Sequence, residues 1–277
     1  MALLPTASSA VSGRVIVTRP EREARVWADA LQARGVPCET LPLIEIAALP
    51  EPSALVQVWQ GFANHLAVMF VSANAVRFFM EAKPRSLTLK NARAWSTGPG
   101  TQAALLAAGW PEFLIDSPPE SAAQFDSEAL WALVAGRAKE AVELARADSS
   151  ATPSVLVVRG ADAQGQLAGR DWLALQLENA GLHVLQTVAY VRQAPVLTPQ
   201  QRDLAHQAVI EGSWYLFSSS EAAEHLLQLC PNLPIGQARA LATHPRIAQR
   251  LLEAGWGHVG IVPAGLERQA ESIKSMT

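Results

Sequence analysis

Short, continuous apolar runs recur along the chain, and segments of helical periodicity separate them. The runs are VIV at 15–17, LAVMFV at 66–71, VLVV at 155–158 and WYLF at 214–217. A strand in a parallel sheet reads as a continuous apolar segment, because helices cover both of its faces. The pattern therefore predicts parallel strands at these four places.

The segments between these runs carry apolar residues three or four positions apart and then a glycine. This ending occurs at Leu31–Gly35, Leu106–Gly109, Leu177–Gly181 and Leu252–Gly255. Glycine ends helices because it adopts a left-handed conformation at little cost. Helices that alternate with buried parallel strands predict an α/β fold with two doubly wound sheets.

The chain contains an internal repeat. ARAWSTGPGTQAALLAAGW at 92–110 aligns without gaps on ARALATHPRIAQRLLEAGW at 238–256, with ten identities in nineteen positions and an offset of 146. At the same offset, FVSANAV at 70–76 falls on LFSSSEA at 216–222. Upstream, the segment that begins RVIVTRP resembles the one that begins SVLVVRG, with six extra residues in the loop of the second copy. The chain therefore has the order a–b–a′–b′. Parts a and a′ each comprise a strand, a loop, a helix and a second strand, and parts b and b′ hold the further strand–helix units that follow.

The repeat can be assembled in two ways, and the pattern does not choose between them. Part a can pair with b, or b and a′ can form one domain inserted between a and b′. LPLIEIAALPEPS and TVAYVRQAPVLTPQ occupy equivalent places in the two copies, and we expect them to be extended linkers that pair with each other. GRAKEAVELARADSSATPS at 136–154 lies between the copies and is expected to be helical, then rich in Ser and Pro, and to form an exposed connection.

The composition is that of a globular chain. Its 277 residues are 49% hydrophobic and 17% charged, which suits two modest domains. A formal net charge of −3 gives no basic footprint, so we expect no nucleic-acid partner. No apolar run is long enough to span a bilayer, and residues 1–12 lack the features of a signal peptide. We therefore expect a cytoplasmic protein without a membrane partner, in which residues 1–12 form a flexible tail.

The cysteines and histidines show no metal-binding spacing. Cys38 and Cys230 are far apart and are expected to be reduced, buried thiols. The six histidines are scattered, without the H-E-x-x-H spacing of a zinc site. We expect no metal ion.

The loop STGPGTQA at 96–103 suggests an alternative, namely that the chain binds NAD or another nucleotide. Gly98, Gly100 and Ala103 fit the G-x-G-x-x-A fingerprint, and Asp116 lies near the place of a ribose-binding acid. The repeat weakens this alternative, because the partner loop ATHPRIAQ lacks both glycines. A non-catalytic two-domain binder of an anionic solute is a further alternative.

Several segments, taken in order, resemble the uroporphyrinogen-III synthase family. They are VIVTRP, FVSANAV, STGPGTQAAL, VAYVR, FSSSEAAEHL and ATHPRIAQRLLEAG. The resemblance implies the crossed arrangement, with a first α/β domain from 13–40 plus 196–277 and a second, inserted over 51–186. Residues 41–50 and 187–195 would be linker strands in a two-stranded β-ladder. Both domains would be doubly wound parallel sheets of the Rossmann or flavodoxin type, with ligand bound between them.

The resemblance also implies a reaction. The family closes linear hydroxymethylbilane, which carries eight carboxylates, to uroporphyrinogen III with loss of water. The last pyrrole ring is inverted through a spiro intermediate, and neither a cofactor nor a metal takes part. The chain would thus be a cofactor-independent lyase of haem biosynthesis, a monomer whose substrate is handed over by hydroxymethylbilane synthase.

Tyr190 is the candidate catalytic residue. It matches the family's tyrosine within VAYVR and would be the acid near the leaving hydroxyl group. The equivalent position in the first copy is Ile44, so an aromatic ring is not a packing requirement of the repeat. An ordinary aromatic residue in a linker strand is the alternative.

The carboxylates of the substrate require N–H groups at helix starts, hydroxyl groups and cations. Candidates at strand-to-helix turns are Ser72, Asn74, Thr97, Gly98, Thr101, Ser218, Ser219, Ser220 and Thr243. Candidate cations are Arg19, Arg159, Arg170 and Arg246. Thr101 matches a threonine of the family, whereas Arg246 stands where part of the family has a threonine. Helix capping is the alternative for the hydroxyl groups, and a solvated surface is the alternative for the arginines.

Overall fold

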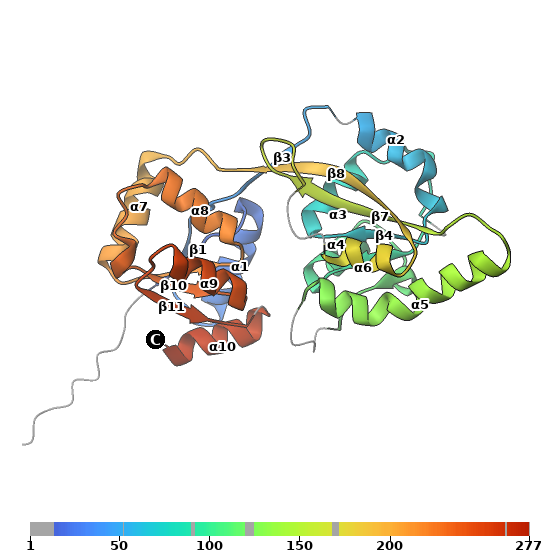
Figure 1. The fold of residues 1–277 in the computed structure, drawn as a ribbon. Helices are drawn as coiled ribbons and strands as arrows, with labels where there is room; N and C mark the ends of the chain where they lie inside the picture. Colours follow the sequence, from blue (N-terminus) through green and yellow to red (C-terminus); the bar gives the residue numbers. More distant parts are fainter. Residues whose placement is uncertain are drawn as a thin grey trace, which may run out of the picture. The chain divides into compact units, whose positions relative to one another are not determined.

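The structure is a computed structural model that describes residues 14–51, 53–89, 92–119, 125–167, 172–263 and 265–276. Its contacts divide the chain into two compact units (Figure 1). Unit 1 comprises Met1–Glu45 and Ala194–Thr277, and unit 2 comprises Ile46–Gln193. The tail predicted at 1–12 lies outside the described residues.

Unit 1 is a parallel sheet with the strand order β11-β10-β9-β1-β2. Its strands are β1 (Val15–Val17), β2 (Cys38–Thr40), β9 (Trp214–Phe217), β10 (Arg239–Ala242) and β11 (His258–Ile261). Its helices are α1 (Glu21–Ala33), α7 (Pro199–Ile210), α8 (Ser220–Leu229), η3 (Ile235–Gln237), α9 (Pro245–Glu253) and α10 (Leu266–Met276). The order is that of a flavodoxin-like doubly wound fold.

Unit 2 has the strand order β3-β8-β7-β4-β5-β6, and the pairs from β8 to β6 are parallel. Its strands are β3 (Glu45–Ala48), β4 (Ala67–Phe70), β5 (Ala94–Ser96), β6 (Ile115–Asp116), β7 (Ser154–Ala161) and β8 (His183–Gln193). Its helices are α2 (Ser53–Gly61), η1 (Phe62–Asn64), α3 (Ala73–Glu81), α4 (Pro99–Ala107), η2 (Glu112–Leu114), α5 (Ser127–Ala147) and α6 (Trp172–Asn179). The predicted linker strands β3 and β8 are neighbours, and they continue the sheet of unit 2.

Helices cover both faces of the unit 2 sheet, as predicted from its continuous apolar strands. Val68 and Phe70 of β4 face a cluster built with α2, α3 and α4. Ala67 and Met69 of the same strand face a second cluster, built with α5 and α6. The alternation along one strand thus buries every side chain, which is why β4 contains no polar residue.

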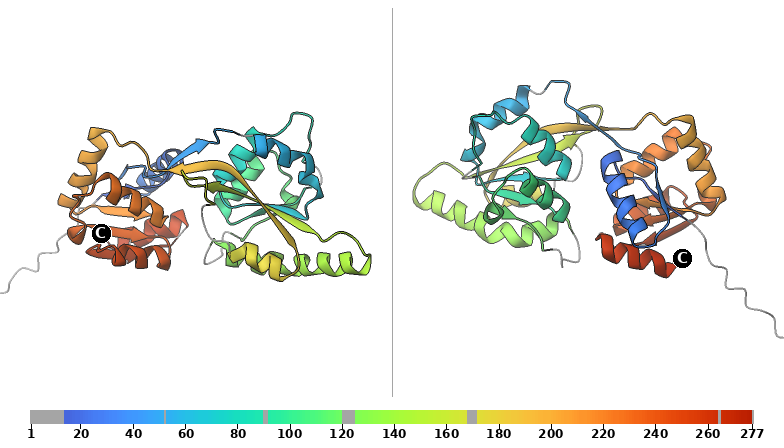
Figure 2. Two further views of the ribbon diagram at one scale, coloured as in Figure 1. Left: turned by 45° about the horizontal axis from the view of Figure 1, so that its top comes forward. Right: turned by 180° about the vertical axis from the view of Figure 1, so that it is seen from behind.

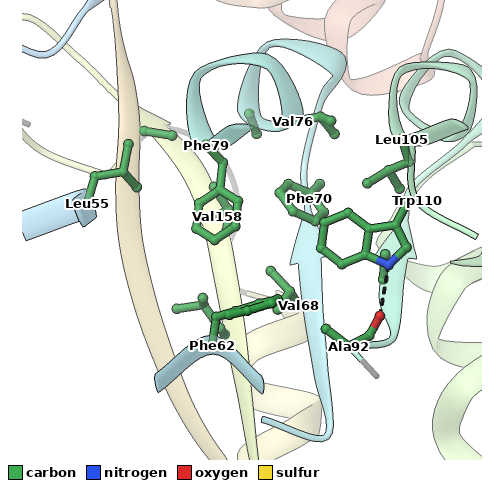
Figure 3. Close-up of a cluster of buried hydrophobic side chains, with 14 of the residues drawn as sticks. Leu55, Phe62, Val68, Phe70, Val76, Phe79, Ala92, Leu105, Trp110 and Val158 are labelled. Carbon is green, nitrogen blue, oxygen red and sulfur yellow. Dashed lines mark hydrogen bonds between the residues drawn. The ribbon is translucent and has the colours of Figure 1, made fainter. Parts of the chain in front are cut away.

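The cluster under α2, α3 and α4 is rich in aromatic rings (Figure 3). Phe70 contacts Phe79 and Trp110 edge to face, with ring centroids 5.4 and 5.5 Å apart. The Trp110 indole N–H donates to the carbonyl of Ala92 over 2.8 Å, which ties the end of α4 to the chain just before β5. In unit 1 the equivalent Trp256 indole nitrogen is buried without such a partner.

The strand orders confirm the internal repeat. β6-β5-β4-β7-β8 of unit 2 corresponds to β11-β10-β9-β1-β2 of unit 1. Helices α4 and α9 keep the offset of 146, and the glycines predicted to end helices all have positive φ, at Gly35, Gly109, Gly181 and Gly255. Each sheet therefore combines strands from both copies: a with b′ in unit 1, and b with a′ in unit 2.

The strand register corrects one part of the repeat alignment. Ala94 of β5 pairs with Val68, whereas the equivalent Ala240 of β10 pairs with Tyr215. The connection between these strands is thus one residue shorter in the second copy. The alignment of 70–76 on 216–222 is therefore wrong by one residue, and Ser72 corresponds to Ser219, each at the N-cap of its helix.

The segment 136–154 was expected to be helical, then rich in Ser and Pro, and exposed; most of its residues are exposed, but Ala138 and Val142 are buried. Residues 136–147 belong to α5, which packs on the sheet through Leu130, Val134, Ala138 and Val142. These four lie at successive fourth positions, so they form one apolar stripe that must be buried. The views in Figure 2 show α5 beside α6 on unit 2. In the described part of the chain, no helix is both long and apolar enough to cross a membrane.

Gly136→Ala should stabilise unit 2. Gly136 is an exposed residue inside α5, and an added Cβ would have no heavy atom within 4 Å. Alanine restricts the unfolded chain and favours the helix, so the free energy of unfolding should rise by about 0.4–1 kcal/mol. Urea unfolding followed by circular dichroism measures this change. Gly181→Ala is the matched control and should destabilise, because φ there is +94° and Val142 Cγ1 lies 3.2 Å from the added Cβ. An unchanged or lower midpoint for Gly136→Ala would contradict the prediction.

Candidate active site

A pocket of about 250 Å³ lies at the carboxyl ends of the central strands of unit 2. From β4 the chain continues through β5 to β6 on one side of the sheet, and from β7 it continues to β8 on the other side. The strand order therefore reverses between β4 and β7. Ligands of doubly wound sheets bind at such switch points. The lining comes from the ends of β4, β7 and β8, from the turn after β5 and from the starts of α5 and α6.

Tyr190 of β8 lines this pocket, and only 2% of its surface is exposed. Its hydroxyl oxygen lies 3.0 Å from Ser72 Oγ. Its ring stacks on Phe78 of α3, with the centroids 5.8 Å apart. The phenol is thus held by apolar packing along its ring and by one polar contact at its tip.

Ser72 connects Tyr190 to the start of α3. Its Oγ accepts a hydrogen bond from the backbone N–H of Ala75 over 3.1 Å, which makes it the N-cap. The oxygen keeps its own proton and a second lone pair, so it can donate to the phenol oxygen or accept from it. The positive end of the α3 dipole also favours negative charge at this place. The arrangement therefore places a hydroxyl group and the N-terminus of a helix beside the phenol oxygen of Tyr190.

The pocket has a cationic lining. Among the described residues that form it, the charged ones are Arg159, Arg192 and Asp126. Arg159 is 3% exposed, and its Nη1 donates to Gln186 Oε1 over 2.7 Å. The Asp126 carboxylate accepts from the backbone N–H of Ala129 over 3.0 Å and so caps α5. Guanidinium groups bind carboxylates well, so Arg159 and Arg192 are the described lining residues that suit an anionic ligand.

The glycine loop reaches the pocket only in part. Thr97 lines it and donates from Oγ1 to the Val71 carbonyl over 3.4 Å. Gly98 caps α4, and an added Cβ would lie 2.8 Å from Phe125 Cβ, so close packing explains this glycine. Thr101 is 6% exposed within α4 and is outside the pocket lining. Thr97 is thus the residue of this loop best placed for a ligand.

Asp116 is engaged in a network that leaves little room for a ribose. Its carboxylate accepts from Arg93 Nη1 over 3.1 Å, from Arg137 Nη1 over 2.6 Å and from the Trp95 indole over 3.0 Å. These contacts fix β6 to β5 and α5. The nucleotide-binding alternative is therefore not favoured.

A second set of predicted residues lies in unit 1, at the carboxyl ends of β1, β9 and β10. It comprises Arg19, Ser218, Ser219, Ser220, Thr243 and Arg246. The Arg19 guanidinium stacks over the Trp27 ring, 3.9 Å from its centroid. Burial lowers the pKa of Arg19 to about 10, against the opposing effect of Glu23, so the side chain is charged at neutral pH. The strand order of this sheet reverses between β9 and β1, so the carboxyl ends of these two strands also form a switch point.

The start of α9 is built differently from the start of α4. His244 caps α9, and its Nδ1 accepts from the backbone N–H of Arg246 over 3.1 Å. Arg246 Nε lies 3.4 Å from the same nitrogen, and its side chain is exposed. The Thr243 N–H donates to the Phe217 carbonyl over 3.1 Å, which holds the turn against β9.

Asn74 and Arg170 are the remaining predicted binding residues. Asn74 lies in the first turn of α3, one residue before Ala75. Arg170 lies outside the described residues. Both cysteines are free and buried. In the described part of the chain, no three His, Cys, Asp or Glu side chains are grouped so that they could hold a metal ion.

Two features of the pocket were not predicted from the sequence. Gly160 lies beneath the Tyr190 ring, and Asp126 caps α5 at the pocket rim. The second could have been found, because an aspartate directly before an apolar helix is a typical N-cap. The first depends on a contact between strands, which no local pattern reveals.

Comparison with known proteins places the chain in a family. Residues 25–264 match the family model described as uroporphyrinogen-III synthase HemD. The crystal structure of uroporphyrinogen-III synthetase from Helicobacter pylori is similar, with a TM-score of 0.58 and 18% identity over 96% of this chain and 100% of that one. A mutant uroporphyrinogen III synthase from Thermus thermophilus is also similar, with a TM-score of 0.52 and 18% identity over 96% and 97% of the two chains. The structural likeness confirms the α/β fold with parallel sheets. Because the family model spans most of the chain, this protein belongs to the uroporphyrinogen-III synthase family.

Proposed function

We propose that this protein closes linear hydroxymethylbilane to uroporphyrinogen III, with loss of water and inversion of the last ring. One observation carries the proposal in this structure. A buried phenol, Tyr190, contacts the N-cap Ser72 and lines a pocket with a cationic lining, in a chain of this family. The nucleotide-binding alternative has no comparable support.

The size of the pocket suits one ring of the substrate. Pockets that enclose a whole small molecule usually measure about 300–1,000 Å³. The volume of about 250 Å³ is below that range and fits a single pyrrole ring with its acidic side chains. Arg159 and Arg192 line the same space and would favour those carboxylates. We infer that the ring bearing the hydroxymethyl group lies here.

The chemistry requires one proton to be given and later returned. The pyrrole nitrogen supplies the electron pair that breaks the C–O bond, while Tyr190 protonates the leaving hydroxyl group so that it departs as water. An azafulvenium-like cation results, and bond formation at the substituted carbon of the last ring gives the spiro intermediate. Fragmentation and closure with the ring turned over then release a proton, which the Tyr190 phenolate takes back. Ser72 and the α3 dipole stabilise that phenolate in the interval.

The remaining parts of the proposal follow from this chemistry. The pyrrole nitrogens supply the electrons, so we propose a lyase that needs no cofactor. We propose that the two units correspond to domains at 13–40 plus 196–277 and at 51–186, with the linker strands between them. The predicted residues of unit 1, and Asn74, Gly98, Thr101 and Arg170, would bind other carboxylates of the substrate. We further propose a cytoplasmic monomer that receives its substrate from hydroxymethylbilane synthase.

The product of the reaction tests the function. Freshly made hydroxymethylbilane is mixed with the protein, and the products are oxidised and separated by isomer. Uroporphyrinogen III should exceed the isomer I that forms spontaneously, because ring inversion requires the substrate to be held folded. Isomer I alone, at the rate seen without protein, would contradict the proposal.

Tyr190→Phe tests the acid. The change removes the proton donor and keeps the ring, so kcat should fall by about 10²–10⁴-fold while KM changes little. Tyr215→Phe is the matched control, because Tyr215 is the other tyrosine of the chain and its hydroxyl donates to the Ala205 carbonyl within unit 1. The control should keep its kcat. Equal kcat values for Tyr190→Phe and the unchanged protein would remove Tyr190 from the acid role.

A further inference from the structure

We propose that Gly160 is a positioning residue, whose missing side chain determines where the Tyr190 hydroxyl group lies. The proposal rests on the proposed function, since it concerns the acid of that reaction. Gly160 lies in β7 and lines the pocket beside Tyr190. Its part in the reaction would be exerted entirely through the tyrosine.

The tyrosine ring occupies the space that a side chain at position 160 would need. An ideal Cβ on Gly160 would lie 2.6 Å from Tyr190 Cε2, 2.7 Å from Cζ and 3.1 Å from the hydroxyl oxygen. Carbon atoms in contact are normally about 3.5–4.0 Å apart. Any other residue here would therefore push the ring tip away from its present place by about 1 Å.

The backbone does not require a glycine at this position. The helix-ending glycines Gly35 and Gly181 have φ values of +78° and +94°, which side chains rarely adopt. Gly160 is not among the residues with positive φ, and it lies near the end of β7. Glycine weakens the interior of a strand, and its presence there often marks a bulge or a close approach by another group. That group is the Tyr190 ring.

A β-bulge brings the two residues opposite each other. Arg159 pairs with Val188, and the next residue of β7, Gly160, pairs with Tyr190. Ala189 is thus an extra residue in β8. Such bulges redirect the side chains that follow them and are common beside active sites. The irregularity places the tyrosine directly across from the one residue of β7 that leaves room for its ring.

The internal repeat provides a comparison within the chain. By the strand alignment of RVIVTRP with SVLVVRG, Gly160 corresponds to Pro20 in the first copy, and Tyr190 corresponds to Ile44. The first copy therefore has neither the glycine nor the tyrosine. The two residues occur together only in the copy that contains the described pocket, which indicates that the glycine serves the tyrosine rather than the fold.

The ring has little freedom to accommodate a displacement. Phe78 stacks on it from α3, and its hydroxyl oxygen lies 3.0 Å from Ser72 Oγ. A shift of about 1 Å would distort or break that contact, because hydrogen bonds require a narrow range of distance and angle. It would also move the acid relative to the leaving group, and a misplacement of this size can cost about 10²-fold in rate.

A double-mutant cycle tests the proposal. Gly160→Ala should lower kcat by about 10–100-fold and leave KM within about threefold. In the Tyr190→Phe background, the same change should alter kcat by less than about twofold, because the hydroxyl group is already absent. Gly136→Ala, which has no neighbour at its Cβ, is the control and should keep full activity. Equal losses in both backgrounds would overturn the proposal, whereas absence of activity in the unchanged protein would overturn the proposed function instead.

Ring position can be measured without any turnover. The chain has two tyrosines, so ¹³C labelling of tyrosine rings gives NMR signals from Tyr190 and Tyr215 only. Gly160→Ala should shift the Tyr190 signals and leave those of Tyr215 in place. If the variant folds poorly, Phe78→Ala is added to remove a side chain that packs on the ring and so give the ring more space. That double variant should keep a reduced kcat relative to Phe78→Ala alone. Unshifted Tyr190 signals, or full recovery of kcat, would contradict the proposal.

Discussion

The candidate site depends on the parallel pairing of β4 with β7. The register runs from Ala67 opposite Val155 to Phe70 opposite Val158, and it joins a strand of the first copy to a strand of the second. This pairing brings the turn after β4, which carries Ser72, next to the end of β7, which carries Arg159. β8 lies on the other side of β7 and adds Tyr190. Three segments far apart in the sequence therefore meet at the carboxyl ends of these neighbouring strands.

Much of this arrangement could be predicted from the sequence. The apolar runs marked the central strands, the glycines marked the helix ends, and the repeat indicated two similar sheets. The helical part of the segment 136–154 was predicted, although two of its side chains, Ala138 and Val142, are buried against the sheet. One part of the repeat alignment was wrong for an identifiable reason. An ungapped alignment cannot reveal a connection that is one residue shorter, so the correspondence of Ser72 with Ser219 follows only from the strand register.

The two copies show how one fold supports different chemistry. Both keep a strand, a turn and a helix that starts with Pro99 or Pro245. The caps at these helices differ, since Gly98 packs on Phe125 whereas His244 accepts from the backbone of Arg246. The pairing of Tyr190 with Gly160 likewise belongs to one copy alone. Close contacts of this kind involve residues about thirty positions apart, so periodicity and short motifs cannot predict them.

The central claim is that the Tyr190 hydroxyl group protonates the leaving group of a ring bound in the pocket of unit 2. A crystal structure of the Tyr190→Phe variant with linear hydroxymethylbilane bound tests it most directly, because the variant should trap the uncyclised substrate. The account predicts that the hydroxymethyl oxygen lies within about 4 Å of the para carbon of the new phenylalanine ring, with carboxylates of the same pyrrole ring near Arg159 or Arg192. A substrate whose hydroxymethyl group lies away from this pocket would contradict the account.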